Sequence, residues 1–231
     1  MGTFSYSIVD LTHTLDENAP TWDGQCGFKQ EITNDYGSIA QFVPFPFRVQ
    51  QISLRSGMGT HLDTPAHYSE GGLTIDQLAL TNLVGPCFVI DVSANAHERS
   101  SVSLEDVENF EKQYGVIPKG SIVMIRTGWD KFWDQPENYR NNNLFPSVSA
   151  KAAEHLLQRN IAGLGVDTPS PDRPEDGYPV HAILLEAQKY ILENVTNLQS
   201  LPPSGSFAMC LPLKTRNGTE GPVRLIGLLN K

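Results

Sequence analysis

Two short, almost uninterrupted apolar runs constrain the fold of this chain most. Residues 87–92 read Cys-Phe-Val-Ile-Asp-Val, and residues 121–125 read Ser-Ile-Val-Met-Ile. Runs of this length, rich in β-branched side chains, are typical of central strands that are buried on both faces. The sequence therefore predicts a sheet whose middle strands are covered on both sides.

The remaining apolar segments are also short and mostly strand-like. Alternating or apolar stretches predict four more strands, and the last two flank Asn217-Gly218, a plausible turn. These stretches are residues 7–11, 45–54, 207–213 and 223–229.

Helices are fewer than strands. Ser103 is typical of an N-cap, and Val107, Phe110 and Tyr114 then follow at helical spacing. Two more helices are predicted over residues 146–159 and 180–188. About three helices against a larger number of strands predict a mixed α/β fold, with a curved or barrel-like β core. A length of 231 residues lies at the upper end of one domain, so we expect a single domain over residues 1–231.

Charge and composition exclude several classes of protein. A net charge of -9 argues against nucleic acid or an anionic membrane as the main partner. No run of 18 apolar residues is present, and residues 1–10 lack the pattern of a signal peptide. The three cysteines are widely spaced, which suits a reducing compartment. We therefore expect a soluble cytoplasmic enzyme that acts on a small molecule.

The segment Gly59-Thr60-His61-Leu62-Asp63-Thr64-Pro65-Ala66-His67 carries the strongest chemical signal. On an extended chain His61 and Asp63 point to the same side, with Cα atoms roughly 6.7 Å apart, so both could reach one ion. Pro65 disfavours continuation of the strand, and a turn there could bring His67 back over the metal. A His-x-Asp pair alone is more often a surface or capping arrangement. Two of the six histidines, however, fall within residues 61–67. With this clustering, a metal site and a surface or capping arrangement are equally favoured.

The stretch from Ile52 to Tyr68 resembles the signature of the cyclase family of metal-dependent hydrolases, His-x-Gly-Thr-His-x-Asp-x-Pro-x-His. Residues 10–13, 125–129 and 165–170 are similar to other parts of that family. The resemblance implies a swivelling β/β/α fold and an arylformamidase-like or cyclic-amide hydrolase-like activity. It also implies a homodimer or homotetramer.

Site residues follow from the same resemblance. It implies that His61 and Asp63 are metal ligands, and that His67 is the catalytic acid/base. The family's later ligands, a His and a Glu twelve residues on, match His181 and Glu193. Twelve helical residues would turn the second ligand about 120° from the first, so a helix should end between them and residues 190–193 should be extended. Without the resemblance, we would interpret His181 as a residue at a helix N-terminus and Glu193 as a solvated surface carboxylate.

The wall of the substrate pocket also has a candidate. Trp22 lies in a loop that resembles the family's substrate wall, where an aromatic side chain would stack on a planar ring; a core-capping role is the alternative. Asp167 and Asp172 follow a predicted strand and could line the site.

One position departs from the family pattern. Gly57 stands where the signature has its first His, which helps to hold one of two ions in the two-zinc members. We therefore expect one divalent ion per chain, Zn²⁺ or Mn²⁺ given the mixed nitrogen and oxygen ligands.

The expected reaction is hydrolysis of a formamide, a cyclic amide or a lactone, with a histidine as the proton shuttle. Two alternatives remain. One is a family member that binds a metal or ligand without turnover, which would hold an ion but hydrolyse nothing. The other is a metal-dependent lyase or isomerase, whose product would not gain the mass of water.

Overall fold

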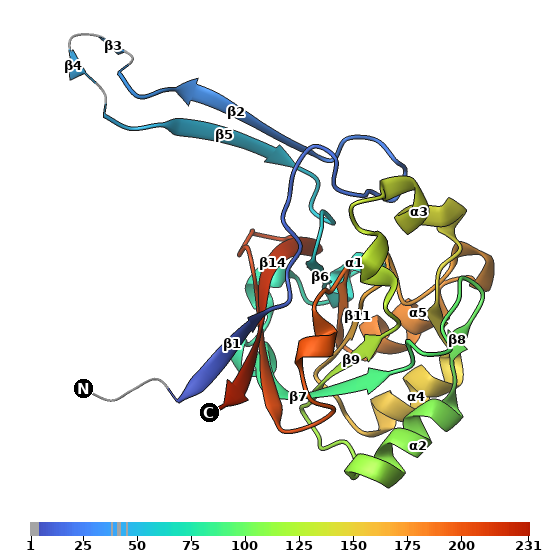
Figure 1. Ribbon diagram of the computed structural model, residues 1–231. Helices are drawn as coiled ribbons and strands as arrows, with labels where there is room; N and C mark the ends of the chain where they lie inside the picture. The colour runs from blue at the N-terminus through green and yellow to red at the C-terminus, as the bar shows by residue number, and fades with distance from the viewer. Residues whose placement is uncertain (1–4, 38, 41–42, 45) are drawn as a thin grey trace.

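A closed barrel of seven strands forms the centre of the computed structural model, which describes residues 5–37, 39–40, 43–44 and 46–231 (Figure 1). Neighbouring strands pair around the ring, and the last pairs with the first. In that order they are β14 (Glu220–Asn230), β13 (Ser206–Pro212), β7 (Val84–Asp91), β9 (Ile122–Arg126), β11 (Gly163–Val166), β12 (Tyr190–Glu193) and β6 (His61–Asp63). A further strand, β1 (Tyr6–Asp10), pairs with β14 outside the ring. The predicted barrel-like β core is confirmed.

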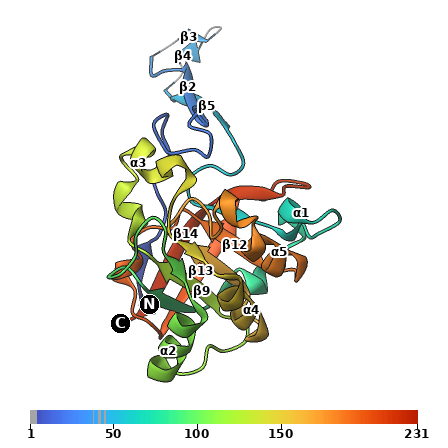
Figure 2. The ribbon, with the colours of Figure 1, turned by 90° about the vertical axis from the view of Figure 1, so that its right-hand side faces the viewer.

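Half of the barrel is parallel, and three helices cover it. β7, β9, β11 and β12 run parallel, and the chain between successive strands holds α2 (Leu104–Tyr114), α4 (Ala150–Gln158) and α5 (Pro179–Glu186). Figure 2 shows these helices packed along one side of the barrel. The helices α2, α4 and α5 are the three that the sequence predicted.

Strand β9 shows why its sequence is apolar throughout. Val123 and Ile125 belong to the core between the sheet and the helices. Ile122 and Met124 alternate with them and belong to the core inside the barrel. All four side chains are fully buried. The strand is therefore buried on both faces, as predicted.

Two glycines of β11 leave room inside the barrel for large neighbours. A Cβ on Gly163 would lie 2.1 Å from the ring of Tyr190, and one on Gly165 would lie 2.2 Å from the sulfur of Met124. Neither position can carry a side chain unless these neighbours move, because protein cores are packed too densely to absorb such contacts.

The described residues form two short α-helices besides the three predicted ones. These are α1 (Pro65–Tyr68) and α3 (Pro136–Arg140), which were not predicted because about one turn of helix gives no periodic pattern. The described residues also form 3₁₀ turns and a two-stranded pair. These are η1 (Ile75–Gln77), η2 (Leu80–Asn82), η3 (Trp129–Phe132), η4 (Asn141–Asn143), η5 (Pro174–Asp176), η6 (Leu198–Ser200), β8 (Ser101–Val102) and β10 (Ser147–Val148). No helix among the described residues is long and apolar enough to cross a membrane.

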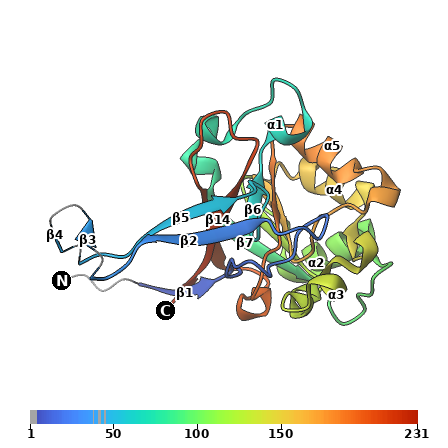
Figure 3. The ribbon, with the colours of Figure 1, turned by 90° about the horizontal axis from the view of Figure 1, so that it is seen from above.

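A two-stranded ribbon projects from the barrel (Figures 1 and 3). It consists of β2 (Phe28–Asn34) paired with β5 (Val49–Leu54), and of the short pair β3 (Ile39–Ala40) and β4 (Val43–Pro44) toward its tip. We call residues 28–54 the arm. The strand predicted over residues 45–54 is shorter, and Phe45 lies outside the described residues. Apolar side chains of the arm remain exposed, among them Ile32, Val49 and Ile52.

Candidate metal centre and active site

The register of three neighbouring strands places four polar side chains together. Glu193 of β12 lies opposite His61 of β6, and Glu220 of β14 lies opposite Asp63. Leu62, between His61 and Asp63, belongs to the core inside the barrel. Because side chains alternate along a strand, His61 and Asp63 share the outer face of the barrel.

The two remaining predicted residues come from helices on this face. His181 lies in α5 and His67 in α1, and these two helices pack against each other. Pro65 is the first residue of α1, and the short helix returns the chain so that the rings of His67 and His181 lie 6.3 Å apart. The helix α5 ends at Glu186 and β12 begins at Tyr190, as the ligand spacing predicted.

The structure brings the four predicted ligands into one buried cluster. The Nε2 atom of His61 lies 3.5 Å from Asp63 Oδ1 and 3.4 Å from Glu193 Oε2. The Nε2 atom of His181 lies 3.8 Å from Asp63 Oδ2 and 3.5 Å from Glu193 Oε1. All four residues are buried. Asp63, His181 and Glu193 each offer an atom within 4.8 Å of the other two, which is close enough for a shared ion.

Hydrogen bonds fix both imidazoles with Nε2 directed into the cluster. His61 Nδ1 donates to the carbonyl oxygen of Gly59 at 2.8 Å. His181 Nδ1 donates to Asp172 Oδ2 at 2.7 Å. In the neutral form each ring therefore presents its Nε2 lone pair to the centre, the state in which histidine binds metals.

The buried charges of the cluster favour a cation. Burial and the charge of Glu193 raise the pKa of Asp63 to about 6. Burial opposes ionisation of Glu193 as well, but hydrogen bonds from His181 and His61 lower its pKa to about 2. Asp63 Oδ1 is buried and has no hydrogen-bond partner among the described residues. Buried carboxylates need pairing or metal coordination, so this donor set fits a divalent cation.

Burial alone would lower the pKa of both imidazoles, yet their neighbours reverse its effect. Asp63 and Glu193 raise the pKa of His61 to about 10, and Asp172 with Glu193 raises that of His181 to about 10. A divalent ion and these imidazole protons therefore compete for the same carboxylate charge, and metal binding should release protons.

The cluster lines a cavity of about 380 Å³. Trp22, Tyr139, Arg140 and Tyr178 contribute to its walls, and His67 also lines it. Trp22 is 41% exposed, with its ring edge against Phe145 at 6.2 Å between centroids. Trp22 therefore lines the cavity and also packs against a buried residue of the aromatic core, so its role in substrate binding stays a prediction.

Two site residues were not predicted from the sequence. Glu220 lies in no motif, and its position is set by the pairing of β14 with β6. For Asp172 the sequence predicted only a possible place in the lining of the site, but Asp172 is buried and is not among the residues that line the cavity. It accepts hydrogen bonds from the backbone N–H groups of Val180 and His181, in the first turn of α5, and from His181 Nδ1, so it orients the imidazole.

Replacing Asp172 by asparagine should weaken metal binding about 10–100-fold, the usual cost of losing the hydrogen-bond partner of a ligand histidine. The amide can no longer accept at both oxygens, so the ring of His181 loses its fixed orientation. Competition with a chelating dye measures the affinity. Asp106→Asn, at the N-terminus of α2 and away from the cavity, is the matched control. An unchanged affinity for Asp172→Asn would contradict the orienting role.

Comparison with known sequences identifies similar proteins over nearly the whole chain. The family model described as "Putative cyclase" matches residues 9–173. Isatin hydrolase of Roseibium aggregatum is 29% identical, over 97% of this chain and 92% of that protein. Kynurenine formamidase of Erythrobacter litoralis is 28% identical, over 95% of this chain and 92% of that protein.

Solved structures agree with this pattern. An isatin hydrolase bound to the product analogue thioisatinate superposes with a TM-score of 0.87 at 27% identity, covering 98% of this chain and 94% of the other. Isatin hydrolase A from Labrenzia aggregata gives a TM-score of 0.86 at 31% identity, covering 98% of this chain and 95% of the other.

Proposed function

Because this chain belongs to the cyclase family, we propose that it is a metal-dependent hydrolase of carbon–nitrogen bonds in a formamide or a cyclic amide. The clustering of His61, Asp63, His181 and Glu193 along one cavity carries the proposal. The unpartnered, buried oxygen Oδ1 of Asp63 supports it, because a bound cation would satisfy that atom.

The metal would be held by His61, Asp63, His181 and Glu193, and we propose Zn²⁺ or Mn²⁺. When bound, a divalent cation supplies Lewis acidity, which polarises the amide carbonyl and makes water more acidic. The hydrogen bonds to Gly59 and Asp172 keep the two ligand imidazoles oriented before substrate arrives.

His67 is the proposed proton shuttle. It lines the cavity beside the cluster, and its ring lies near His181 without belonging to the set of four. In amide hydrolysis water adds to the carbonyl carbon, the carbon–nitrogen bond breaks, and the nitrogen leaves with a proton. His67 would take a proton from the attacking water and give it to the departing nitrogen.

Arg140 is suited to the charge that the reaction creates. Hydrolysis of an amide leaves a carboxylate on the acyl fragment. Of the described residues that line the cavity, Arg140 is the one lysine or arginine. Gly24 gives its guanidinium room, since a Cβ on Gly24 would lie 2.2 Å from Arg140 Nη1. An arginine in this position would hold an anionic group of substrate or product.

The decisive experiment measures metal content and activity on the same untagged protein. N-Formylkynurenine, isatin and small lactones are the substrates to screen, with product mass as the readout. Hydrolysis adds the mass of water. A product without that gain would indicate a lyase or isomerase, and a bound ion with no turnover would indicate a binding protein. We further propose a homodimer or homotetramer in the cytoplasm, which the native mass and cell fractionation would test.

Trp22→Ala should raise KM about 10-fold and leave kcat and metal content nearly unchanged. Stacking of an aromatic ring on a planar substrate is worth roughly 0.5–1.5 kcal/mol, and tenfold in affinity corresponds to about 1.4 kcal/mol. Trp22→Phe is the matched control, because it keeps an aromatic face and should retain most of the affinity. A fall in kcat with an unchanged KM would place Trp22 outside substrate binding.

A further inference from the structure

We propose that Glu220 completes a second cation position together with His61 and Asp63. With two ions bound, His61 Nε2 would serve the second position, and Asp63, His181 and Glu193 would hold the first. The proposal rests on the metal-dependent function proposed above, and concerns how many ions the site holds. The sequence predicted a single ion because Gly57 carries no imidazole. Glu220, from the other end of the chain, supplies a ligand in the same place.

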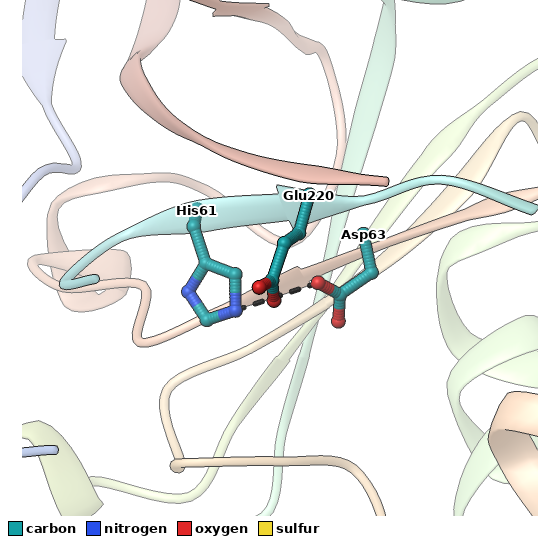
Figure 4. A group of neighbouring side chains, drawn as sticks. All are labelled: His61, Asp63 and Glu220. Atoms are coloured by element: carbon teal, nitrogen blue, oxygen red, sulfur yellow. Dashed lines mark ion pairs between the residues drawn. The ribbon is translucent and has the colours of Figure 1, made fainter. Parts of the chain in front are cut away.

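Figure 4 shows the Glu220 carboxylate lying beside His61 and Asp63. His61, Asp63 and Glu220 each offer a ligand atom within 4.8 Å of the other two. The pairing of β14 with β6 sets this arrangement, since Glu220 is the cross-strand partner of Asp63. The register of a closed barrel holds such neighbours in place, so no loop has to move to bring Glu220 to the site.

The space beside Gly57 is occupied by the Glu220 carboxylate. A Cβ on Gly57 would lie 2.6 Å from Glu220 Oε2 and 3.4 Å from His61 Nε2. A side chain at position 57 would therefore enter the space that Glu220 fills, directly beside a ligand nitrogen of the cluster. Gly57 is not among the glycines with a positive φ, so backbone conformation does not explain its presence.

The two oxygens of Asp63 face two different imidazoles. Oδ2 lies 3.8 Å from His181 Nε2, on the side of the first position. Oδ1 lies 3.5 Å from His61 Nε2, and it is the buried oxygen without a hydrogen-bond partner. Glu193 divides in the same way, with Oε1 toward His181 and Oε2 toward His61. Two carboxylates that each face both sides are arranged to bridge two ions.

Charge also favours a second ion. Asp63, Glu193 and Glu220 carry three negative charges when ionised, and one divalent ion leaves one of them uncompensated in a largely buried site. The second position offers one imidazole nitrogen and otherwise carboxylate oxygens. Carboxylate-rich sites suit Mn²⁺ better than sites with more nitrogen or sulfur, so Mn²⁺ is the expected occupant.

The test is the stoichiometry of Mn²⁺ alone, measured by equilibrium dialysis and elemental analysis. The unmodified protein should bind two equivalents, and Glu220→Gln should bind one. Glu154→Gln, which removes the same charge from an exposed position on α4, should still bind two. Electron paramagnetic resonance gives a second readout, because two neighbouring Mn²⁺ ions couple and broaden the signal. The narrower signal of an isolated ion should appear in Glu220→Gln.

An exchange of ligands tests whether Glu220 takes the place of an imidazole. Gly57→His alone should be disfavoured by contact with Glu220. The double variant Gly57→His, Glu220→Ala should fold and regain the second equivalent, and if it folds but binds one ion the exchange is contradicted.

The two proposals fail in different ways. One equivalent in the unmodified protein, or two in Glu220→Gln, would overturn the second position. Hydrolysis by such a protein would leave the proposed function standing. Absence of any bound ion would instead contradict the metal-dependent function itself.

Discussion

Asp63→Asn should abolish metal binding and hydrolysis together, the largest effect expected from any single substitution. Asp63 is 1% exposed, and its two oxygens face His61 and His181 separately. The amide keeps the shape of the side chain but loses the negative charge and one acceptor oxygen. Activation by a bound metal is worth several kcal/mol, so kcat/KM should fall about 10³-fold or more.

Thermal unfolding separates this effect from loss of the fold. An ion that binds only the folded state raises the melting temperature, and the rise grows with the logarithm of the ratio of free ion to its dissociation constant. The unmodified protein should show this rise on addition of Mn²⁺ or Zn²⁺, and Asp63→Asn should not. Without metal the variant should be at least as stable as the unmodified protein, because Asp63 and Glu193 no longer repel each other. A variant that retains a tightly held ion would require another residue in the role of Asp63.

His67→Gln should lower kcat by about 10²–10⁴, the usual contribution of a positioned acid/base, and leave the metal bound. The side chain lines the cavity but stands apart from the four converging ligands, with Glu220 Oε2 3.7 Å from its Nδ1 atom. Glutamine keeps a polar side chain of similar length and cannot shuttle a proton. Elemental analysis and steady-state kinetics on the same sample measure both quantities.

His97→Gln is the matched control for this substitution, since His97 lies in an exposed turn outside the cavity. It should change neither kcat nor metal content. Loss of the ion from His67→Gln would instead make His67 a ligand, and the proton shuttle would then have to be sought among the other residues that line the cavity.

Local patterns predicted most of the strands and helices, because each depends on periodicity within a few residues. The apolar runs in β7 and β9 indicated burial on both faces, and the structure confirms it for β9. β7 contributes side chains to both cores, but Phe88 is only partly buried and Asp91 is exposed. Trp129 and Trp133, four residues apart, pack with Tyr139 and Phe145 in a small core of their own. Closure of the barrel could not be predicted in this way, since it depends on pairing between β6 and β14, far apart in sequence.

The site residues also differ in whether local sequence patterns could predict them. His61 and Asp63 are two residues apart, so the geometry of a strand predicts that they share a face. His181 and Glu193 depended on resemblance to a family, because a spacing of twelve residues has no geometric meaning until the helix is known to end between them. Glu220 could not be predicted by either route, since only the register of the closed barrel places it beside Asp63.

The arm has a consequence for the energetics of substrate binding. At its base the backbone N–H of Arg55 donates to Gly27, and the Arg55 guanidinium pairs with Asp23, the residue after Trp22. An isolated two-stranded ribbon is only marginally stable. These contacts couple the order of the arm to the order of the segment that carries Trp22. The coupling is reciprocal, so ordering of either segment stabilises the other by the same free energy. A ligand that fills the cavity should slow amide hydrogen exchange along β2 and β5, well away from any atom it touches.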